Sequence, residues 1–159
     1  MKTDFATPVR ARARPDDEEA LSALARKAYE HYIPILKAVP LPMTADYGAM
    51  IRDHETWTLR AGSRLVGSLV LIHEEHHLMI ESVAVDPETQ GNGFGRQLLA
   101  FAEQRAQAEG YADLRLYTNA LMTENRAWYR RIGFIETGEE QRGDKRVVHM
   151  SKAIHSVPS

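Results

Sequence analysis

The 159-residue sequence contains no cysteine, and this absence excludes several kinds of chemistry. Disulfide bonds, catalytic thiolates and zinc sites built on thiolates all require that side chain. A chain without cysteine is compatible with a reducing compartment, and we expect a cytoplasmic location. We also expect no metal site, because the histidine- and glutamate-rich run 73–77 falls at a turn between two expected strands, not on one helix face.

Long apolar runs are missing as well. No segment approaches the roughly 20 apolar residues of a membrane-spanning helix, and the first residues lack the apolar stretch of a signal peptide. Neither sign of charge dominates, since 20 Lys and Arg stand against 22 Asp and Glu. A general nucleic-acid-binding protein usually carries a basic face. We therefore expect neither a membrane nor a nucleic-acid partner.

The composition that remains is typical of one globular domain. Hydrophobic residues make up 43% of the chain and charged residues 26%, and this length suits a single core. We expect one domain over residues 1–159, with a core from about residue 9 to about residue 151. Short tails at residues 1–7 and 155–159 are expected to be mobile.

The periodicity of apolar residues predicts the order of the elements. Alternation predicts strands at residues 8–14, 56–61, 64–72, 78–85, 113–118, 134–138 and 146–151. Helical spacing and end signals predict helices at residues 17–32, 45–52, 94–108 and 125–132. Pro34, Pro40 and Pro42 predict an irregular loop between the first two helices. The order β-α-α-β-β-β-α-β-α-β-β predicts an α/β domain with a mixed sheet.

The most informative stretch is residues 83–96, which read Val-Ala-Val-Asp-Pro-Glu-Thr-Gln-Gly-Asn-Gly-Phe-Gly-Arg. The apolar residues end a buried strand, and Pro87 stops it because proline has no N–H for a ladder. A glycine-rich turn then leads into a helix. Such a turn leaves backbone N–H groups free at the positive end of the helix dipole, which suits a phosphate or pyrophosphate.

The spacing of the glycines decides between kinds of phosphate site. A P-loop is excluded, because no Lys-Ser or Lys-Thr follows the glycines. A dinucleotide-binding oxidoreductase is disfavoured, because Arg96 stands where the third glycine belongs and the loop lies in the middle of the chain. The pattern that fits is Gln-x-x-Gly-x-Gly, formed by Gln90, Gly93 and Gly95. Taken alone, the loop could also be an ordinary junction between a strand and a helix.

A second motif lies downstream. Residues 125–134 read Asn-Arg-Ala-Trp-Tyr-Arg-Arg-Ile-Gly-Phe and predict a helix that ends at Gly133, with Phe134 packing back onto it. Asn125 lies one turn before Tyr129, so the two side chains share a helix face.

Together the two motifs resemble the signatures of the GCN5-related N-acetyltransferase (GNAT) superfamily, and the resemblance extends from about Val9 to about Met150. The second family signature is Asn-x-x-Ala-x-x-x-Tyr-x-x-x-Gly-Phe, whereas this chain has Asn-x-Ala-x-Tyr-x-x-x-Gly-Phe. The spacing from Tyr129 to Gly-Phe agrees. The resemblance implies an α/β fold of the α+β type, whose mixed, mostly antiparallel sheet is flanked by helices and splays between strands 4 and 5.

The resemblance also implies acetyl-CoA as the cofactor, with direct attack on its thioester by a primary amine of a small molecule or peptide. A non-catalytic module that binds acyl-CoA on the same fold is the alternative, and a homodimer is a family-based expectation. The residues implied in cofactor binding are Val83, Ala84, Val85, Gln90, Gly91, Asn92, Gly93, Phe94, Gly95, Arg96, Asn119, Asn125 and Tyr129.

Two residues are implied in catalysis. Tyr129 is the expected proton donor to the leaving thiol, since a tyrosine pKa of about 10 lies close to a thiol pKa of about 8.5. We expect Trp128 to supply the core-facing ring, which leaves Tyr129 free for chemistry. Glu81 lies two residues before Val83, and alternation places it on the same strand face. It is a candidate general base, a candidate substrate ligand, or neither.

The remaining candidates are less defined. Asn119 and Asn125 are expected either to bind the cofactor arm or to serve as turn and cap residues. Acceptor sites in this fold are built mainly from the first two helices and their loop, where Tyr29 and Tyr32 are candidates. That region is aromatic and apolar with few acids. It therefore fits a small amine, an amino-acid derivative or a peptide N-terminus better than a polycation.

Overall fold

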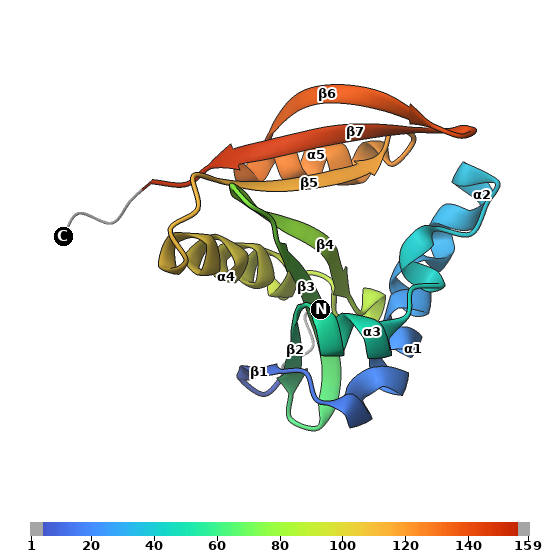
Figure 1. Ribbon diagram of the computed structural model, residues 1–159. Coiled ribbons are helices and arrows are strands. Elements are labelled where there is room, and N and C mark those ends of the chain that lie inside the picture. The colour runs from blue at the N-terminus through green and yellow to red at the C-terminus, as the bar shows by residue number, and fades with distance from the viewer. Residues whose placement is uncertain (1–4, 156–159) are drawn as a thin grey trace.

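The computed structural model describes residues 5–155, so most of the two tails expected to be mobile lies outside the described residues. Seven strands form one sheet (Figure 1), with bounds β1 (Pro8–Arg12), β2 (Glu55–Ala61), β3 (Arg64–His73), β4 (His77–Val85), β5 (Asp113–Asn119), β6 (Ile135–Arg142) and β7 (Lys145–Ala153). The helices are α1 (Glu18–Tyr29), α2 (Ile33–Leu36), α3 (Tyr47–Asp53), α4 (Phe94–Ala108) and α5 (Thr123–Ile132). Short 3-10 turns are η1 (Pro15–Asp17), η2 (Glu30–Tyr32), η3 (Leu41–Met43) and η4 (Pro87–Thr89).

The order of the strands in the sheet is β1-β2-β3-β4-β5-β7-β6. Every neighbouring pair is antiparallel except β4 and β5, which are parallel. This topology confirms the predicted mixed, mostly antiparallel sheet flanked by helices.

The sheet opens between β4 and β5. Only residues 77–79 of β4 pair with residues 113–115 of β5, whereas β5 pairs with β7 along its full length. Beyond residue 79 the two strands diverge (Figure 1), so the backbone of residues 80–85 has β3 on one side and no strand on the other. The predicted splay between strands 4 and 5 is therefore confirmed.

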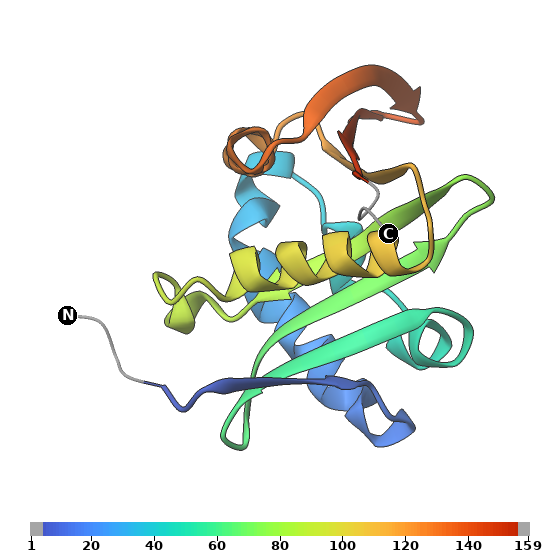
Figure 2. The ribbon, with the colours of Figure 1, turned by 90° about the vertical axis from the view of Figure 1, so that its left-hand side faces the viewer.

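Helices cover both faces of the first half of the sheet. In Figure 2, α4 crosses in front of the strands and α1 lies behind them. The buried α4 residues Leu98 and Leu99 belong to a large core with Leu69 of β3. Leu21 of α1 packs with Val70 in a smaller core on the opposite face. The second half of the sheet, β5-β7-β6, packs against α5.

The first helix departs from the expected boundaries. It ends at Tyr29, and the chain continues through η2 into α2. Pro34, expected to break the chain into loop, instead lies in the first turn of α2. The reason is that a first-turn residue has no intrahelical acceptor for its N–H, so proline loses nothing there. The α1–α2 segment is consequently a helical arm that reaches toward the splay (Figure 1).

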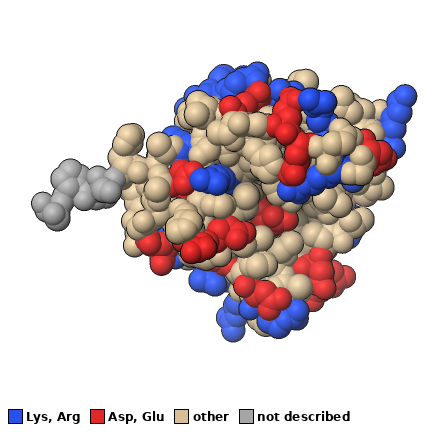
Figure 3. All heavy atoms as spheres, turned by 45° about the horizontal axis from the view of Figure 1, so that its top comes forward, with Lys and Arg blue, Asp and Glu red and all other residues tan. Residues whose placement is uncertain are grey.

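Charge is mixed over the surface that Figure 3 shows, where acidic and basic side chains are interspersed with neutral ones. Within residues 5–155, no helix is both long and apolar enough to cross a membrane. The same part of the chain gathers no group of three or more His, Asp or Glu side chains suited to a metal ion.

Candidate active site

The turn after β4 is fixed by a buried carboxylate. Asp86 is 4% exposed, and its side chain accepts hydrogen bonds from the Glu88 amide at 2.9 Å, Arg64 Nη2 at 2.9 Å and Lys27 Nζ at 3.3 Å. Burial by itself would raise the pKa of Asp86, but these donors outweigh it and lower the pKa. The Thr89 hydroxyl also donates to the Asp86 carbonyl at 2.8 Å. The turn is therefore held in one shape while Asp86 is ionised.

The glycine loop presents backbone rather than side chains. Gly91 and Gly93 have φ of 87° and 76°, and a Cβ on either would meet nothing within 4 Å. Asn92 Nδ2 donates to the Thr89 carbonyl at 2.7 Å, which turns the loop back on itself. Gly93 precedes α4 with no side-chain cap, and the amides of residues 94–96 lie in the first turn, where a helix offers no internal acceptor. The loop therefore has the geometry of an anion cradle.

A cavity of about 650 Å³ lies against this loop. It is lined by 12 of the 13 predicted cofactor-binding residues, namely Val83, Ala84, Val85, Gln90, Gly91, Asn92, Gly93, Phe94, Gly95, Arg96, Asn125 and Tyr129. Phe94 contributes backbone, since its ring is 4% exposed and belongs to the core. The wall also includes Ala28, Tyr29, His31, Tyr32, Thr89, Glu124 and Trp128. We call this space the loop cavity.

A second cavity of about 790 Å³ lies on the other side of the splay. Its wall comes from the α2–η3 segment, from Glu81 and Ser82 of β4, from residues 117–122 and from the tip of the β6–β7 hairpin. We call this space the arm cavity. Asn119, the thirteenth predicted cofactor residue, lines the arm cavity and not the loop cavity.

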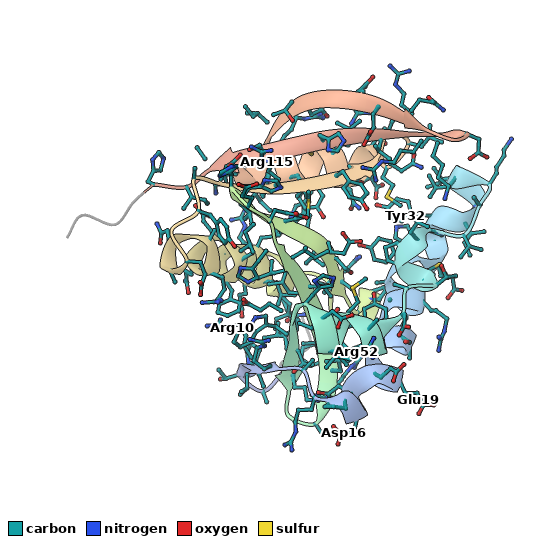
Figure 4. The ribbon with its side chains drawn as sticks, viewed as in Figure 1. Arg10, Asp16, Glu19, Tyr32, Arg52 and Arg115 are labelled. Atoms are coloured by element: carbon teal, nitrogen blue, oxygen red, sulfur yellow. The ribbon has the colours of Figure 1, made fainter. Side chains whose placement is uncertain are left out.

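Four residues line both cavities: Tyr29, Val83, Asn125 and Tyr129. They mark the junction of the two cavities, where a ligand in one cavity would meet a ligand in the other. Tyr29 is fixed there, because its hydroxyl donates to the Val83 carbonyl at 2.9 Å. Figure 4 shows Tyr32 reaching from the helical arm toward the splay, and Tyr32 lines the loop cavity alone. Of the two tyrosines predicted for the acceptor site, only Tyr29 reaches the arm cavity.

Tyr129 is the buried aromatic of its helix, contrary to our expectation for Trp128. Its side chain is 6% exposed and belongs to the large core, with Phe134 at 5.8 Å between ring centroids. Trp128 is only partly buried, because it lies beside the glycine loop: a Cβ on Gly95 would sit 3.0 Å from its ring. Burial raises the pKa of Tyr129. Among residues 5–155, no hydrogen-bond partner holds its hydroxyl.

Glu81 does not share a face with Val83, so the prediction from alternation is wrong. A β-bulge interrupts the β3–β4 pairing: Val70 pairs with Ser82 and Leu71 with Ile80, which leaves Glu81 as the extra residue. Ile80 and Val83 both enter the large core on the α4 side. Glu81 instead lies toward Tyr47 of α3, which belongs to the smaller core on the opposite face. Bulges commonly re-aim a side chain in this way beside a site.

The environment of Glu81 weakens its acidity. Burial raises its pKa, and the nearby side chains of His54 and Arg142 oppose that rise without cancelling it. A carboxylate with a raised pKa is a better proton acceptor near neutral pH.

The two asparagines have different surroundings. Asn119 Oδ1 accepts a hydrogen bond from the Leu121 amide at 2.9 Å, which is a turn interaction. Asn125 is not the cap of α5, because the helix begins two residues earlier at Thr123. Its amide contacts Met122 Sδ at 3.8 Å and lies on the wall of both cavities.

Sequence reasoning missed part of the arm cavity. Ser82 is 7% exposed and lines the cavity together with Tyr47 of α3. Lys37, Gln141 and residues 144–147 also line the cavity. No local motif marks these residues, because only the fold brings the hairpin tip opposite the helical arm.

Comparison with known proteins agrees with this geometry. Residues 19–134 match the family model described as Acetyltransferase (GNAT) family, and the chain belongs to this family. Over 63 residues it is 38% identical to mycothiol acetyltransferase from Saccharopolyspora erythraea, a match that covers 40% of this chain and 21% of that protein. The chain thus spans about a fifth of the length of that relative.

Two solved structures share the fold. The ribosomal-protein-S18-alanine N-acetyltransferase from Escherichia coli superposes with a TM-score of 0.77 at 19% identity, covering 96% of this chain and 97% of that one. The paia N-acetyltransferase from Thermoplasma acidophilum, solved in complex with coenzyme A, gives a TM-score of 0.79 at 18% identity, covering 92% and 99%.

Proposed function

We propose that this family member is an acetyl-CoA-dependent N-acetyltransferase that acetylates a primary amine of a small molecule or peptide by direct attack. The observation that carries the proposal is the junction: Tyr129 lines a cavity built on the glycine loop and also a cavity that contains Glu81. One cavity can hold the acetyl donor and the other the acceptor, with a proton donor between them.

The cofactor is acetyl-CoA, as membership of the acetyltransferase family indicates, and the loop cavity fits it. The amides of the α4 first turn suit the pyrophosphate. The edge of residues 80–85 has no strand on its open side, so its backbone suits the peptide-like arm as an added strand would. When bound, the cofactor supplies the acetyl thioester.

Tyr129 donates a proton, or a strong hydrogen bond, to the departing sulfur. The raised pKa keeps its hydroxyl protonated throughout the neutral range. The same shift moves that pKa further above the thiol value of about 8.5, so the near match expected from ordinary values is lost. The hydroxyl therefore acts mainly by stabilising negative charge as it develops on sulfur.

Glu81 accepts the proton that the attacking amine must lose. It is half-buried on the arm-cavity side and its pKa is raised, both of which favour proton uptake. Ser82, adjacent on the bulge, also lines this cavity, as does Tyr47.

The test has two stages. A thermal melt with acetyl-CoA, CoA and NAD in parallel should show a rise with the first two alone, of about 5–10 °C at a hundredfold excess over the dissociation constant. Amine-dependent release of thiol is then measured over a panel of primary amines. A shift with CoA but no turnover of any amine would instead indicate a module that only binds acyl-CoA, and no shift with CoA would refute the proposal.

A further inference from the structure

The mouth of the arm cavity lies between two segments that are far apart in the sequence. Figure 1 shows α2 and the turn of the β6–β7 hairpin opposite one another at the open end of the splay. Each contributes one lysine to the cavity wall, Lys37 from the end of α2 and Lys145 from the start of β7. Within residues 5–155, no carboxylate oxygen lies within 4.0 Å of either ammonium nitrogen.

Other cations of this hairpin are neutralised. Arg142 Nε lies 2.7 Å from Glu140 Oε1, and Arg146 Nε lies 2.7 Å from Glu139 Oε2. The two lysines therefore stand apart as positive charges available to a ligand. Asp144, in the hairpin turn, is the one carboxylate of the described cavity wall besides Glu81.

The backbone at Lys37 is a second, independent observation. With φ of 53° and ψ of 33°, it is the only non-glycine residue with positive φ in the described part of the chain. This left-handed conformation is strained for an L-residue, and glycine would avoid most of that strain. The turn after α2 does not itself require a side chain here. The chain nevertheless places a lysine at this point of the cavity wall.

The inner wall of the arm cavity is acidic and apolar, unlike the mouth with its two lysines. Glu81 lies within the arm cavity, and Ser82 and Tyr47 contribute to the same wall. Apolar side chains supply much of the remaining wall, among them Leu36, Val39, Leu41, Leu121, Met122 and Val147. The cavity thus has an acid inside, an apolar stretch and two unpaired cations at its mouth.

We propose that the acceptor is an amine that also carries a carboxylate, separated from the amino group by an apolar body. The amino group lies beside Glu81 and Tyr129, and the carboxylate lies at the mouth between Lys37 and Lys145. This inference rests on the proposed N-acetyltransferase function. The same chemistry describes an ω-amino acid and a short apolar peptide with a free C-terminus, and the two sources are distinguished by the test.

The test compares each carboxylate with its own amide. The pairs are 6-aminohexanoate with 6-aminohexanamide and leucyl-leucine with leucyl-leucinamide, in which the carboxylate lies far enough from the amine to leave the amine's basicity nearly unchanged. For at least one pair, kcat/KM for the acid should exceed that for the amide by on the order of tenfold. The pair with the larger ratio identifies the source. The ratio should fall as salt is added, because the contacts are partly exposed.

Variants then assign the preference to the two lysines. Lys37→Asn removes the charge with a residue that tolerates the left-handed backbone, and Lys145→Gln removes the other. Each should lower the acid-to-amide ratio, and the double variant should bring it near one. Lys145→Glu should reverse the preference toward the amide. Arg131→Gln, an exposed position on α5 that lines neither cavity, is the matched control and should leave the ratio unchanged.

The outcomes separate this inference from the function on which it rests. Equal turnover of acid and amide by the wild-type protein overturns the inference and leaves the N-acetyltransferase function standing. A preference for the acid that survives in the double variant also overturns it. No acetylation of any amine, acid or amide overturns both.

Discussion

The interaction that we expect to contribute most to stability lies far from both cavities. Glu55, 6% exposed at the start of β2, receives hydrogen bonds from Arg105 Nε at 2.6 Å and Nη2 at 2.9 Å and from Trp57 Nε1 at 2.8 Å. His73 Nε2 lies 2.8 Å from its second oxygen. This cluster joins the last turn of α4 to β2 and β3. It therefore anchors the end of α4 opposite the glycine loop.

The pKa of Glu55 gives the magnitude. Burial by itself would raise it, but Arg105, Trp57 and His73 outweigh burial and lower it from 4.5 to about 2. That fall corresponds to about 3 kcal/mol of preference for the ionised form in the folded state. Because the folded pKa is depressed, the contribution is fully present above about pH 4.5 and is lost as pH falls toward about 2.

The assay is urea denaturation of the wild type and of Glu55→Gln at pH 7 and at pH 3.5. At pH 7 we expect the variant to lose about 2–4 kcal/mol of unfolding free energy, because it leaves Arg105 without its buried charged partner and with only the exposed Glu109. The difference between the two proteins should shrink at pH 3.5. Glu109→Gln is the control: Glu109 contacts the same arginine at 2.9 Å but is 45% exposed, so we expect a loss of about 0.5 kcal/mol or less.

Two results would refute this reasoning. One is a loss below about 1 kcal/mol for Glu55→Gln at pH 7, since the cluster would then be a set of weak surface contacts. The other is an equal loss at both pH values, since the cost would then come from packing and not from the charge on Glu55.

Three further predictions concern the site. Tyr129→Phe should lower kcat by about 10²–10⁴ while the thermal shift with CoA persists; unaltered turnover would exclude its role in proton donation. The wild-type rate should rise with pH as Glu81 ionises at its raised pKa. Glu81→Gln should lose this acidic limb of the pH–rate profile. An acidic limb that remains in the variant would belong to another group. Gly95→Ala should weaken CoA binding measured by calorimetry, because its methyl group would lie 3.0 Å from the Trp128 ring. The double variant with Trp128→Leu should recover part of the loss, and no recovery would argue against a steric cause.

The sequence predicted the fold and the loop cavity well because both depend on local patterns. The glycines at 91 and 93 need positive φ for a turn that is complete within residues 86–97, and its residues are adjacent in the chain. Alternation located every strand and the order of elements predicted a mixed sheet, whereas the mostly antiparallel pairing and the splay were implied by the family resemblance. One error arose because an extra residue in a strand reverses the alternation of its side chains, as at the Glu81 bulge. The other arose because the position of a residue around a helix decides its burial, as with Trp128 and Tyr129.

The arm cavity could not be predicted in the same way, for a reason that bears on substrate choice. Its wall combines residues 36–42, 80–83, 117–122 and 144–147, which no sequence window contains. The glycine loop is proposed to bind a single cofactor, which restricts its sequence. The arm and the hairpin tip are surface connections whose side chains can change without disturbing the sheet. Lys37 is an example. Its left-handed backbone is a local feature of the arm-cavity wall, but its meaning for substrate binding depends on Lys145, which the fold places on the other side of the mouth. Acceptor preference should therefore follow substitutions at the mouth while cofactor binding follows the loop, and the acid-to-amide ratio and the CoA thermal shift measure the two separately.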